Sequence, residues 1–207
     1  EQSLKTQYQN ASNISARINL HSLYSQNEQH WFPWIFEQCM ISTGQNILEI
    51  GCGDGSFWAE NMEQVPDDIQ IFLSDKSDGM LRDAAKRVGS EDSRFHFCTF
   101  DCIDIPYDSA RFDRVIANHV LFYCSDIPAV CREVSRVLKP SGRVICSTYG
   151  ANHMIDINRI VTEFDDRIVL SAEQLYFHFG RENATEIVHK YFSDVRWISY
   201  EDSLFIT

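Results

Sequence analysis

Short apolar runs alternate with amphipathic stretches along most of this chain, and this pattern predicts strands that alternate with helices. The runs are rich in Ile, Leu, Val and Phe, as buried strands of a parallel sheet are. They cover residues 46–50, 69–73, 95–100, 112–117 and 143–148. Regular strand–helix alternation is typical of an α/β fold with a doubly wound parallel sheet, in which all strands end on one edge.

Cap residues mark helices in the intervals between these runs. Ser56 and Ser77 each precede an amphipathic stretch, and Gly89 follows the second stretch as a helix stop. Asp126, with Pro128 in the first turn, predicts another helix that presents an apolar stripe to the sheet. We therefore expect helices after the first, second and fourth strands.

Two regions lie outside this alternation. Residues 1–45 are expected to form a helical N-terminal cap or lid, which ends in an aromatic cluster. Residues 46–207 form the expected core domain. Within the core, residues 151–181 are expected to be an additional covering segment, because a helical pattern interrupts the alternation there.

The end of the chain carries further signals. Ser171 and Gln174 have the spacing of a capping box, and residues 182–192 have the pattern of a last amphipathic helix. Residues 195–200 and 203–207 are expected to be two closing strands.

The composition limits the class of protein. The chain has 207 residues, which fit one domain, and 44% of them are apolar, enough for a buried core. A net charge of −12 argues against nucleic acid and anionic membrane as partners, because both carry phosphate charge. No run approaches the ~20 apolar residues of a membrane-spanning helix, and residues 1–5 do not resemble a signal peptide.

Seven cysteines form an odd set without a C-x-x-C pair, and the histidines lack the spacing of a zinc motif. Several of the cysteines lie inside apolar runs. We therefore expect reduced thiols, no metal site and a cytoplasmic protein, either a monomer or a homodimer.

The most informative stretch is an apolar strand that leads directly into Gly51, Gly53 and Gly55. Main chain that touches a ligand cannot carry side chains, and glycine tolerates the positive φ that such a turn often needs. A strand, a glycine turn and a helix in this order bind nucleotide-like ligands in open α/β sheets. The dinucleotide fingerprint G-x-G-x-x-G is not met, because Ser56 stands at its third glycine. An NAD(P)-dependent oxidoreductase is nevertheless kept as an alternative.

Acidic residues are expected on the same edge of the sheet. Asp75 comes directly after the second strand, where a carboxylate can accept both hydroxyls of a ribose. Asp101 comes directly after the third strand, where it can accept the amino group of an adenine, and Glu49 precedes the glycine turn. Three carboxylates suit a positively charged, phosphate-free adenosine better than a pyrophosphate, because like charges repel.

These residues resemble the class I S-adenosylmethionine-dependent methyltransferases of the small-molecule type. The matching pieces, in the order of the family, are residues 48–55, Asp75, Asp101, 112–119 and 133–142. The resemblance implies a seven-stranded sheet whose last strand is antiparallel. It also implies S-adenosylmethionine (SAM) as cofactor, S-adenosylhomocysteine (SAH) as its product and a small-molecule methyl acceptor.

The resemblance further implies which residues bind the cofactor. In the family the glycine turn packs on the methionine part, the acid after the second strand binds ribose, and the acid after the third faces adenine. The residues carried over are Glu49, Gly51, Cys52, Gly53, Gly55, Asp75, Lys76, Met80, Asp101, Cys102 and Asn118. A SAM-binding partner protein without catalysis is an alternative on the same scaffold.

Methyl transfer from a sulfonium is an in-line displacement, so the protein mainly supplies alignment and a dry site. A base is needed only for a weak nucleophile, and the candidate catalytic residues are His119, Tyr24 and Tyr123. His119 follows the fourth strand, beside the expected sulfonium; a purely local hydrogen bond is the alternative role. Tyr123 is more typical of an amphipathic pocket wall than of a base.

The acceptor is expected to meet the N-terminal cap. Arg17, His21 and Tyr24 share one helix face, which can form a lid with Arg17 recognising a carboxylate. A solvated polar stripe is the alternative. Trp31 and Tyr149 are the other candidates for contact with the substrate. For Trp31, packing in the core between the cap and the sheet is the alternative role.

Overall fold

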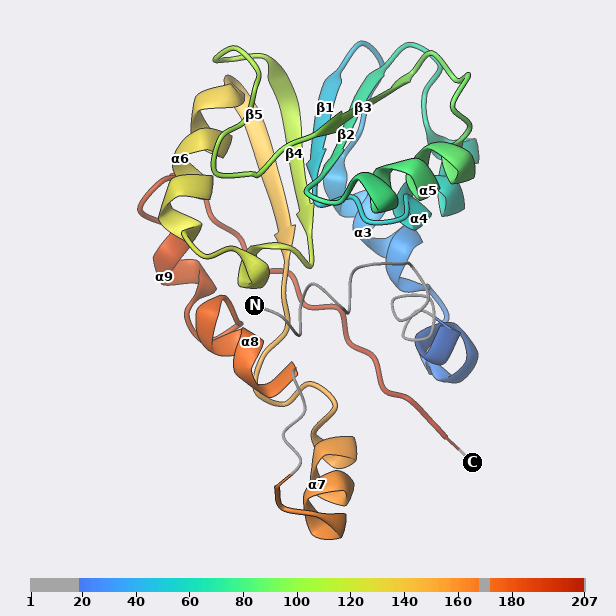
Figure 1. The fold of residues 1–207 in the computed structure, drawn as a ribbon, viewed down its shortest axis with the longest axis vertical. Coiled ribbons are helices and arrows are strands. Elements are labelled where there is room, and N and C mark those ends of the chain that lie inside the picture. Colours follow the sequence, from blue (N-terminus) through green and yellow to red (C-terminus); the bar gives the residue numbers. More distant parts are fainter. Residues whose placement is uncertain (1–18, 168–171, 207) are drawn as a thin grey trace.

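A computed structural model describes residues 19–167 and 172–206 of the chain. Its centre is a parallel sheet with the strand order β3-β2-β1-β4-β5 (Figure 1). The strands are β1 (Asn46–Ile50), β2 (Gln70–Asp75), β3 (Phe95–Thr99), β4 (Phe112–Asn118) and β5 (Leu138–Ser147). The winding direction reverses between β1 and β4, and such a switch point is where open α/β sheets bind ligands. The predicted α/β fold and its parallel sheet are confirmed.

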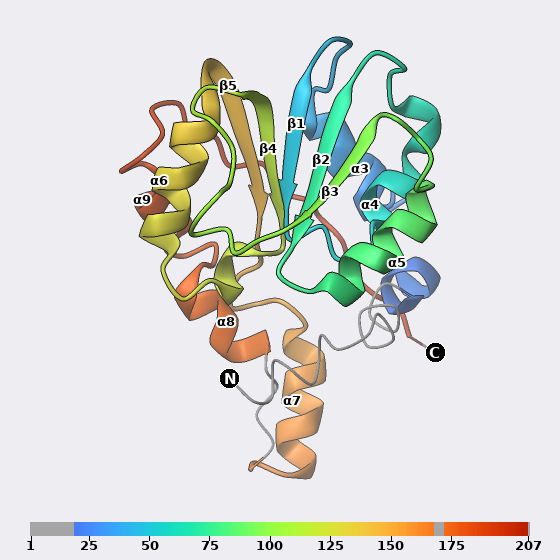
Figure 2. The same cartoon turned by 45° about the horizontal axis from the view of Figure 1, so that its top comes forward.

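Helices cover both faces of this sheet (Figures 1 and 2). One face carries α3 (Trp31–Cys39), α4 (Ser56–Glu60) and α5 (Asp78–Val88), and the other carries α6 (Ile127–Val137) and α9 (Ala184–Val188). Consecutive side chains of a strand point to opposite faces. In β1, Ile47 therefore joins the core under α3, α4 and α5, while Leu48 joins the core under α6 and α9.

The chain beyond β5 forms α7 (Ile155–Phe164) and α8 (Ala172–His178) before α9. It then runs as an extended segment past the strand ends toward the N-terminal cap (Figure 1). There Ser25 and Leu204 form an isolated antiparallel bridge, and the Gln26 amide donates to the Ser203 carbonyl at 2.9 Å. No helix in the two described ranges is both long enough and apolar enough to cross a membrane.

Two predicted helix caps are confirmed. The Ser77 hydroxyl accepts a hydrogen bond from the Met80 amide at the start of α5, and Gly89 is the C-cap of that helix. The Asp126 carboxylate accepts from the Ala129 amide at 2.8 Å at the start of α6. Each cap supplies a partner to an N–H group that the first helical turn leaves unpaired.

The prediction that Ser56 caps a helix is wrong. Ser56 is the first residue of α4, and Gly55 holds the N-cap position with a φ of 76°. A Cβ at Gly55 would lie 3.0 Å from the Cα of Ala84 in α5. The close approach of α4 to α5, rather than a side-chain cap, therefore decides which residue stands at this helix start.

The expected seven-stranded sheet with an antiparallel last strand is wrong for the described residues, whose sheet has five strands, all parallel. Residues 195–200 and 203–206 form no ladder, apart from the single bridge at Leu204. Alternating side chains identify a segment that suits a sheet, but a strand exists only where a neighbour takes its hydrogen bonds.

Aromatic packing holds the C-terminal segment, residues 195–206, against α3. The ring of Tyr200 lies against Trp31 and Trp34 of α3, with centroids 5.2 and 5.1 Å away. Its hydroxyl donates to the carbonyl of Gln29 at 2.9 Å. The segment is therefore bound to the N-terminal cap rather than to the free edge of β5.

Two further boundaries differ from the expected ones. The last helix is α9 alone rather than residues 182–192, because the Lys190 and Tyr191 amides donate only three residues back, to the Ile187 and Val188 carbonyls. β5 begins at Leu138 rather than at residue 143, with a register shift in its pairing to β4. The predicted capping box begins at Ser171, which lies outside the described residues.

Gly55→Ala is expected to lower the free energy of unfolding by about 2–4 kcal/mol, since it adds positive-φ strain and a clash with the backbone of α5. Gly44→Ala is the matched control. Gly44 also has a positive φ of 74°, but nothing lies within 4 Å of a Cβ there. Only about 1–2 kcal/mol of strain is expected for it. Chemical denaturation compares the two variants, and equal losses would contradict the close-approach explanation.

Candidate active site

One large cleft of about 2500 Å³ runs along β5 and across the carboxyl ends of the strands. The strand ends, α3 and the extended C-terminal segment line it. It brings together most of the predicted cofactor-binding residues, namely Glu49, Gly51, Cys52, Gly53, Asp75, Lys76, Met80, Asp101, Cys102 and Asn118. Gly55 is not a lining residue, because it is turned against α5.

The residues predicted for catalysis and for the acceptor are divided by the fold. The cleft is lined by His21, Trp31, His119, Tyr123 and Tyr149. Tyr24 is not part of the lining, and its carbonyl accepts a hydrogen bond from the Phe205 amide at 2.9 Å. Arg17 lies outside the described residues. Of the predicted lid face, only His21 is therefore seen at the cleft.

The glycine turn offers bare main chain to the cleft. Gly51 and Gly53 have φ values of 68° and 57°, a region that residues with a side chain enter only at a cost. At Gly51 a Cβ would lie 2.4 Å from Cγ2 of Val120, so the turn packs directly against the loop after β4. Such a turn lets a ligand contact backbone atoms.

Asp75 ties this turn to the end of β2. Its carboxylate accepts hydrogen bonds from the Gly53 amide at 3.1 Å and from the Ser77 amide at 2.8 Å. Burial raises the pKa of Asp75, against the lowering effect of these backbone donors. Each oxygen that holds an amide still has a second lone pair for a ligand.

Asp101 stands at the rim of the cleft and is compensated by a lysine. The Lys76 ammonium lies 2.6 Å from its carboxylate, with the two side chains 80% and 37% exposed. The hydrogen bond from Lys76 holds the pKa of Asp101 below its usual range. An ion pair this exposed is worth little energy, so a ligand can replace it at low cost.

Glu49 lines the cleft, but its charge differs from the one that the sequence suggests. The residue is 1% exposed, and its carboxylate accepts a hydrogen bond from Nε1 of Trp58 at 2.7 Å. Burial raises the pKa of Glu49 to about 8, even though the Trp58 bond favours the charged form. Its carboxyl group is therefore mostly protonated at neutral pH. The expectation of three negative charges around the turn is corrected to two, of which one is paired with Lys76.

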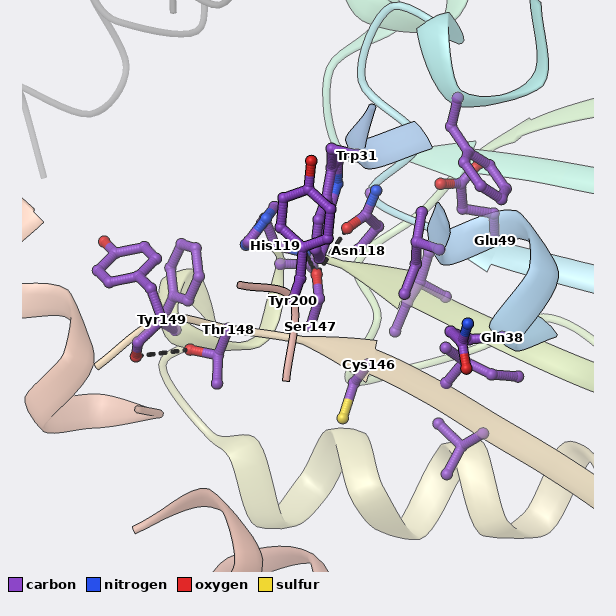
Figure 3. A pocket seen from close by; sticks show the side chains of 18 of the residues that line it. Trp31, Gln38, Glu49, Asn118, His119, Cys146, Ser147, Thr148, Tyr149 and Tyr200 are labelled. Carbon is purple, nitrogen blue, oxygen red and sulfur yellow. Dashed lines mark hydrogen bonds between the residues drawn. The ribbon is translucent and has the colours of Figure 1, made fainter. Parts of the chain in front are cut away.

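His119 is held in a strained conformation at the tip of β4. Its φ is 56°, a positive value that is uncommon outside glycine and that clusters at functional sites. Ser147, at the end of β5, accepts from the His119 amide at 2.9 Å and donates to the Asn118 side chain at 2.6 Å (Figure 3). These two bonds lock the neighbouring strand tips together.

Aromatic rings surround His119 on several sides. Trp31 stacks on its imidazole with centroids 5.0 Å apart, and Phe122 and Tyr149 lie at 6.2 and 6.4 Å. Burial lowers the pKa of His119 to about 4, and nearby His153 adds to this effect. The ring is therefore neutral at neutral pH, with one unprotonated nitrogen.

Some important residues were missed by sequence reasoning. Ser147 has a signal that could have found it, because it is a polar residue at the carboxyl end of a predicted strand. Trp58 and Tyr200 have no such signal. Trp58 contacts Glu49 of a different element, and Tyr200 contacts Trp31, which is distant in the sequence.

Comparison with known proteins places this site in a family. Residues 48–146, which run from β1 to β5, match the family model described as a methyltransferase domain. These residues, just under half of the chain, are therefore similar to the methyltransferase domain family. The matched range contains the glycine turn, Asp75, Asp101 and His119.

Two curated relatives are 26% and 29% identical to this chain over the aligned residues. The malonyl-[acyl-carrier protein] O-methyltransferase of Serratia marcescens is 26% identical over 162 residues, which cover 77% of this chain and 59% of that protein. The demethylmenaquinone methyltransferase of Symbiobacterium thermophilum is 29% identical over 120 residues, which cover 57% and 48%. The chain thus spans about half the length of these relatives.

Solved structures support the same fold. Phosphoethanolamine N-methyltransferase 2 of Haemonchus contortus, in complex with SAM, has a TM-score of 0.65 at 22% identity over 89% of this chain and 42% of that chain. The methyltransferase bound to the Trm112 activator of Haloferax volcanii has a TM-score of 0.61 at 19% identity, over 88% and 74%. At these identities the likeness establishes the Rossmann-like methyltransferase fold.

Glu49→Gln is expected to change how stability depends on pH. The pKa of Glu49 is about 8 in the folded chain against an ordinary 4.5. Below about pH 4.5 the group is protonated in both the folded and the unfolded chain, so its burial costs no stability. Between about pH 4.5 and 8 the unfolded chain releases the proton and the folded chain keeps it, so the free energy of unfolding falls as pH rises. Glutamine keeps an oxygen for Trp58 but cannot ionise. Relative to the original protein, the variant gains up to about 1.4 kcal/mol per pH unit in this window.

Denaturation of both proteins at pH 5 and pH 8 measures this difference. A stability difference that is the same at the two pH values would show that Glu49 does not titrate with a raised pKa.

Proposed function

We propose that this domain transfers a methyl group from SAM to a small-molecule acceptor. One observation carries the proposal. The bare glycine turn, two carboxylates at the ends of β2 and β3, and a neutral histidine at the end of β4 all line one cleft. The match to the methyltransferase domain family and the activities of the relatives named above support the same reaction class.

The residues of the cleft fit SAM. The turn at Gly51 and Gly53 has no side chain that would keep the methionine part away. Asp75 has free lone pairs for ribose hydroxyls, and Asp101 is an exposed acceptor for the amino group of adenine. The neutral state of Glu49 means that these two acids, and not three, provide the negative charge.

The start of α4 argues against a dinucleotide. A pyrophosphate would bind the free amides at a helix start after the glycine turn. Here the Ser56 amide already donates to the Asp54 carboxylate at 3.1 Å, and Arg87 pairs with the same carboxylate at 2.8 Å. A phosphate would have to displace a buried carboxylate. The NAD(P)-dependent alternative is therefore disfavoured.

When bound, SAM supplies a methyl group on a sulfonium, which is already activated for displacement. The residues of the chain then have to orient the two reactants and exclude water. Asp75 and Asp101 orient the nucleoside end, while Trp31, Tyr149 and Tyr200 form an apolar cover over the strand tips. His119 has a neutral imidazole that can take a proton from the nucleophilic atom of an acceptor.

A small acceptor is favoured over nucleic acid. The net charge of −12 repels phosphate backbones, and the relatives named above include enzymes for demethylmenaquinone and malonyl-[acyl-carrier protein]. His21, His153 and Tyr149 form a cluster of rings beside His119, and we assign the acceptor to that part of the cleft. Seven free thiols support a reducing, cytoplasmic location.

Isothermal titration calorimetry with SAM, SAH and NAD tests this function. SAM and SAH are expected to bind, and a hundredfold excess over the Kd should add about 2.7 kcal/mol to the free energy of unfolding. Binding of NAD in place of both would refute the proposal. So would the absence of binding by either sulfur nucleoside at millimolar concentration.

Asp75→Asn is expected to raise the Kd of SAH about tenfold or more, because hydrogen bonds to a charged group are the strong ones. Asp78→Asn is the matched control. Asp78 lies three residues further along, is exposed and does not line the cleft. An equal effect of both substitutions would argue that Asp75 does not contact the ligand.

The low pKa of His119 gives a separate prediction. An NMR titration of its imidazole should find it neutral down to about pH 5, consistent with a pKa of about 4. Trp31→Ala uncovers the ring and should move the pKa back toward the ordinary 6.5. A pKa above about 6 in the unchanged protein would contradict the buried, neutral base.

A further inference from the structure

Two cysteines meet at the rim of the cleft. Cys102 directly follows Asp101 in the loop after β3, and Cys124 follows the short helix η2 (Leu121–Tyr123) in the loop after β4. Their sulfur atoms lie 3.4 Å apart. Both residues are partly buried and line the cleft, so their thiols remain accessible from it.

This separation is a non-bonded thiol contact from which a disulfide can form after a small movement. An S–S bond measures about 2.05 Å, so the sulfur atoms need to approach by a little over 1 Å. The two cysteines stand 22 positions apart in the sequence and belong to different loops, and loops adjust more easily than strands. None of the other cysteines is needed for this contact.

We propose that Cys102 and Cys124 are a redox-sensitive dithiol, which closes to a disulfide by exchange with a small disulfide and thereby weakens cofactor binding. The first part rests on the geometry of the two thiols alone. The second part rests on the proposed function, because it assumes that SAM and SAH bind beside Asp101.

Cys124 is the thiol that we expect to attack first. The sulfur contact with Cys102, in which either thiol can donate, lowers the pKa of Cys124, and the Lys76 ammonium acts in the same direction. The same contact raises the pKa of Cys102. A thiolate next to a cation is the reactive form of cysteine, while its neutral neighbour serves as the resolving thiol.

The exchange balances in two steps. The Cys124 thiolate attacks one sulfur of the small disulfide R–S–S–R, forms a mixed disulfide and releases one RS⁻. The Cys102 thiol then loses its proton and attacks the Cys124 sulfur, which releases the second RS⁻. Two electrons and two protons pass from the cysteine pair to the small disulfide, which leaves as two RSH molecules.

Closure affects the cofactor through Asp101. The new bond draws the loop after β3 toward the loop after β4, and Asp101 is the neighbour of Cys102 in that loop. A hydrogen bond tolerates only a few tenths of an ångström of misplacement before it weakens. Any part of the closing movement that reaches the backbone of Cys102 therefore displaces the Asp101 carboxylate from the amino group that it is proposed to accept.

Treatment of the reduced protein with oxidised glutathione tests the proposal. Peptide mapping by mass spectrometry is expected to find a Cys102–Cys124 cross-link with the loss of two hydrogen atoms. Calorimetry should find the Kd of SAH raised about fivefold or more, with recovery after dithiothreitol. The cross-link is read without cofactor, so failure of the proposed function would leave that result intact.

Two variants sharpen the experiment. Cys124→Ser should give no cross-link, and its affinity for SAH should not respond to oxidised glutathione. Cys98→Ser is the control, because Cys98 is also partly buried but does not line the cleft, and it should behave like the unchanged protein. Oxidation of other cysteines without a Cys102–Cys124 bond would overturn the proposal. A complete cross-link with unchanged affinity for SAH would overturn its regulatory part.

Discussion

The hydrogen bond from the Gly53 amide to the Asp75 carboxylate is the interaction on which the site depends. It links the turn after β1 to the end of β2, and the second oxygen of Asp75 anchors the start of α5 through Ser77. With the turn held in this way, Gly51 packs against Val120 after β4. Three strand ends thus share one rigid corner, and the cleft opens beside it. A corner that is already ordered loses little conformational entropy when it binds a ligand.

Burial changes the electrostatics of this corner. A count of acidic residues suggests a strongly negative site, yet Glu49 is protonated against Trp58 and Asp101 is paired with Lys76. Recognition of the nucleoside therefore depends more on directed hydrogen-bond acceptors than on net charge. The same logic applies to His119, whose neutral ring follows from its apolar surroundings. Both groups have the protonation state that their burial imposes, not the one that their residue type suggests.

Much of the fold could be predicted because the relevant signals are local. The apolar runs located the five strands, and the caps at Ser77 and Asp126 marked two helices, since each signal involves residues a few positions apart. The cleft also gathers most of the residues that the family resemblance singled out. The failures are nonlocal. Ser56 lost its expected cap role to a contact between two helices, and the closing strands failed because Tyr200 packs on α3 instead of pairing with β5.

The sequence by itself determined the α/β alternation, the glycine turn and the acids at the strand ends, because strand order along the chain dictates which residues meet at one edge of a parallel sheet. Only the tertiary structure decided the charge of Glu49, the stacking of Trp31 on His119, the role of Ser147 and the meeting of Cys102 with Cys124. Each of these depends on atoms from different elements approaching within a few ångströms. Hydrogen bonds, desolvation and thiol contacts fall off over that distance, so a linear pattern does not contain them.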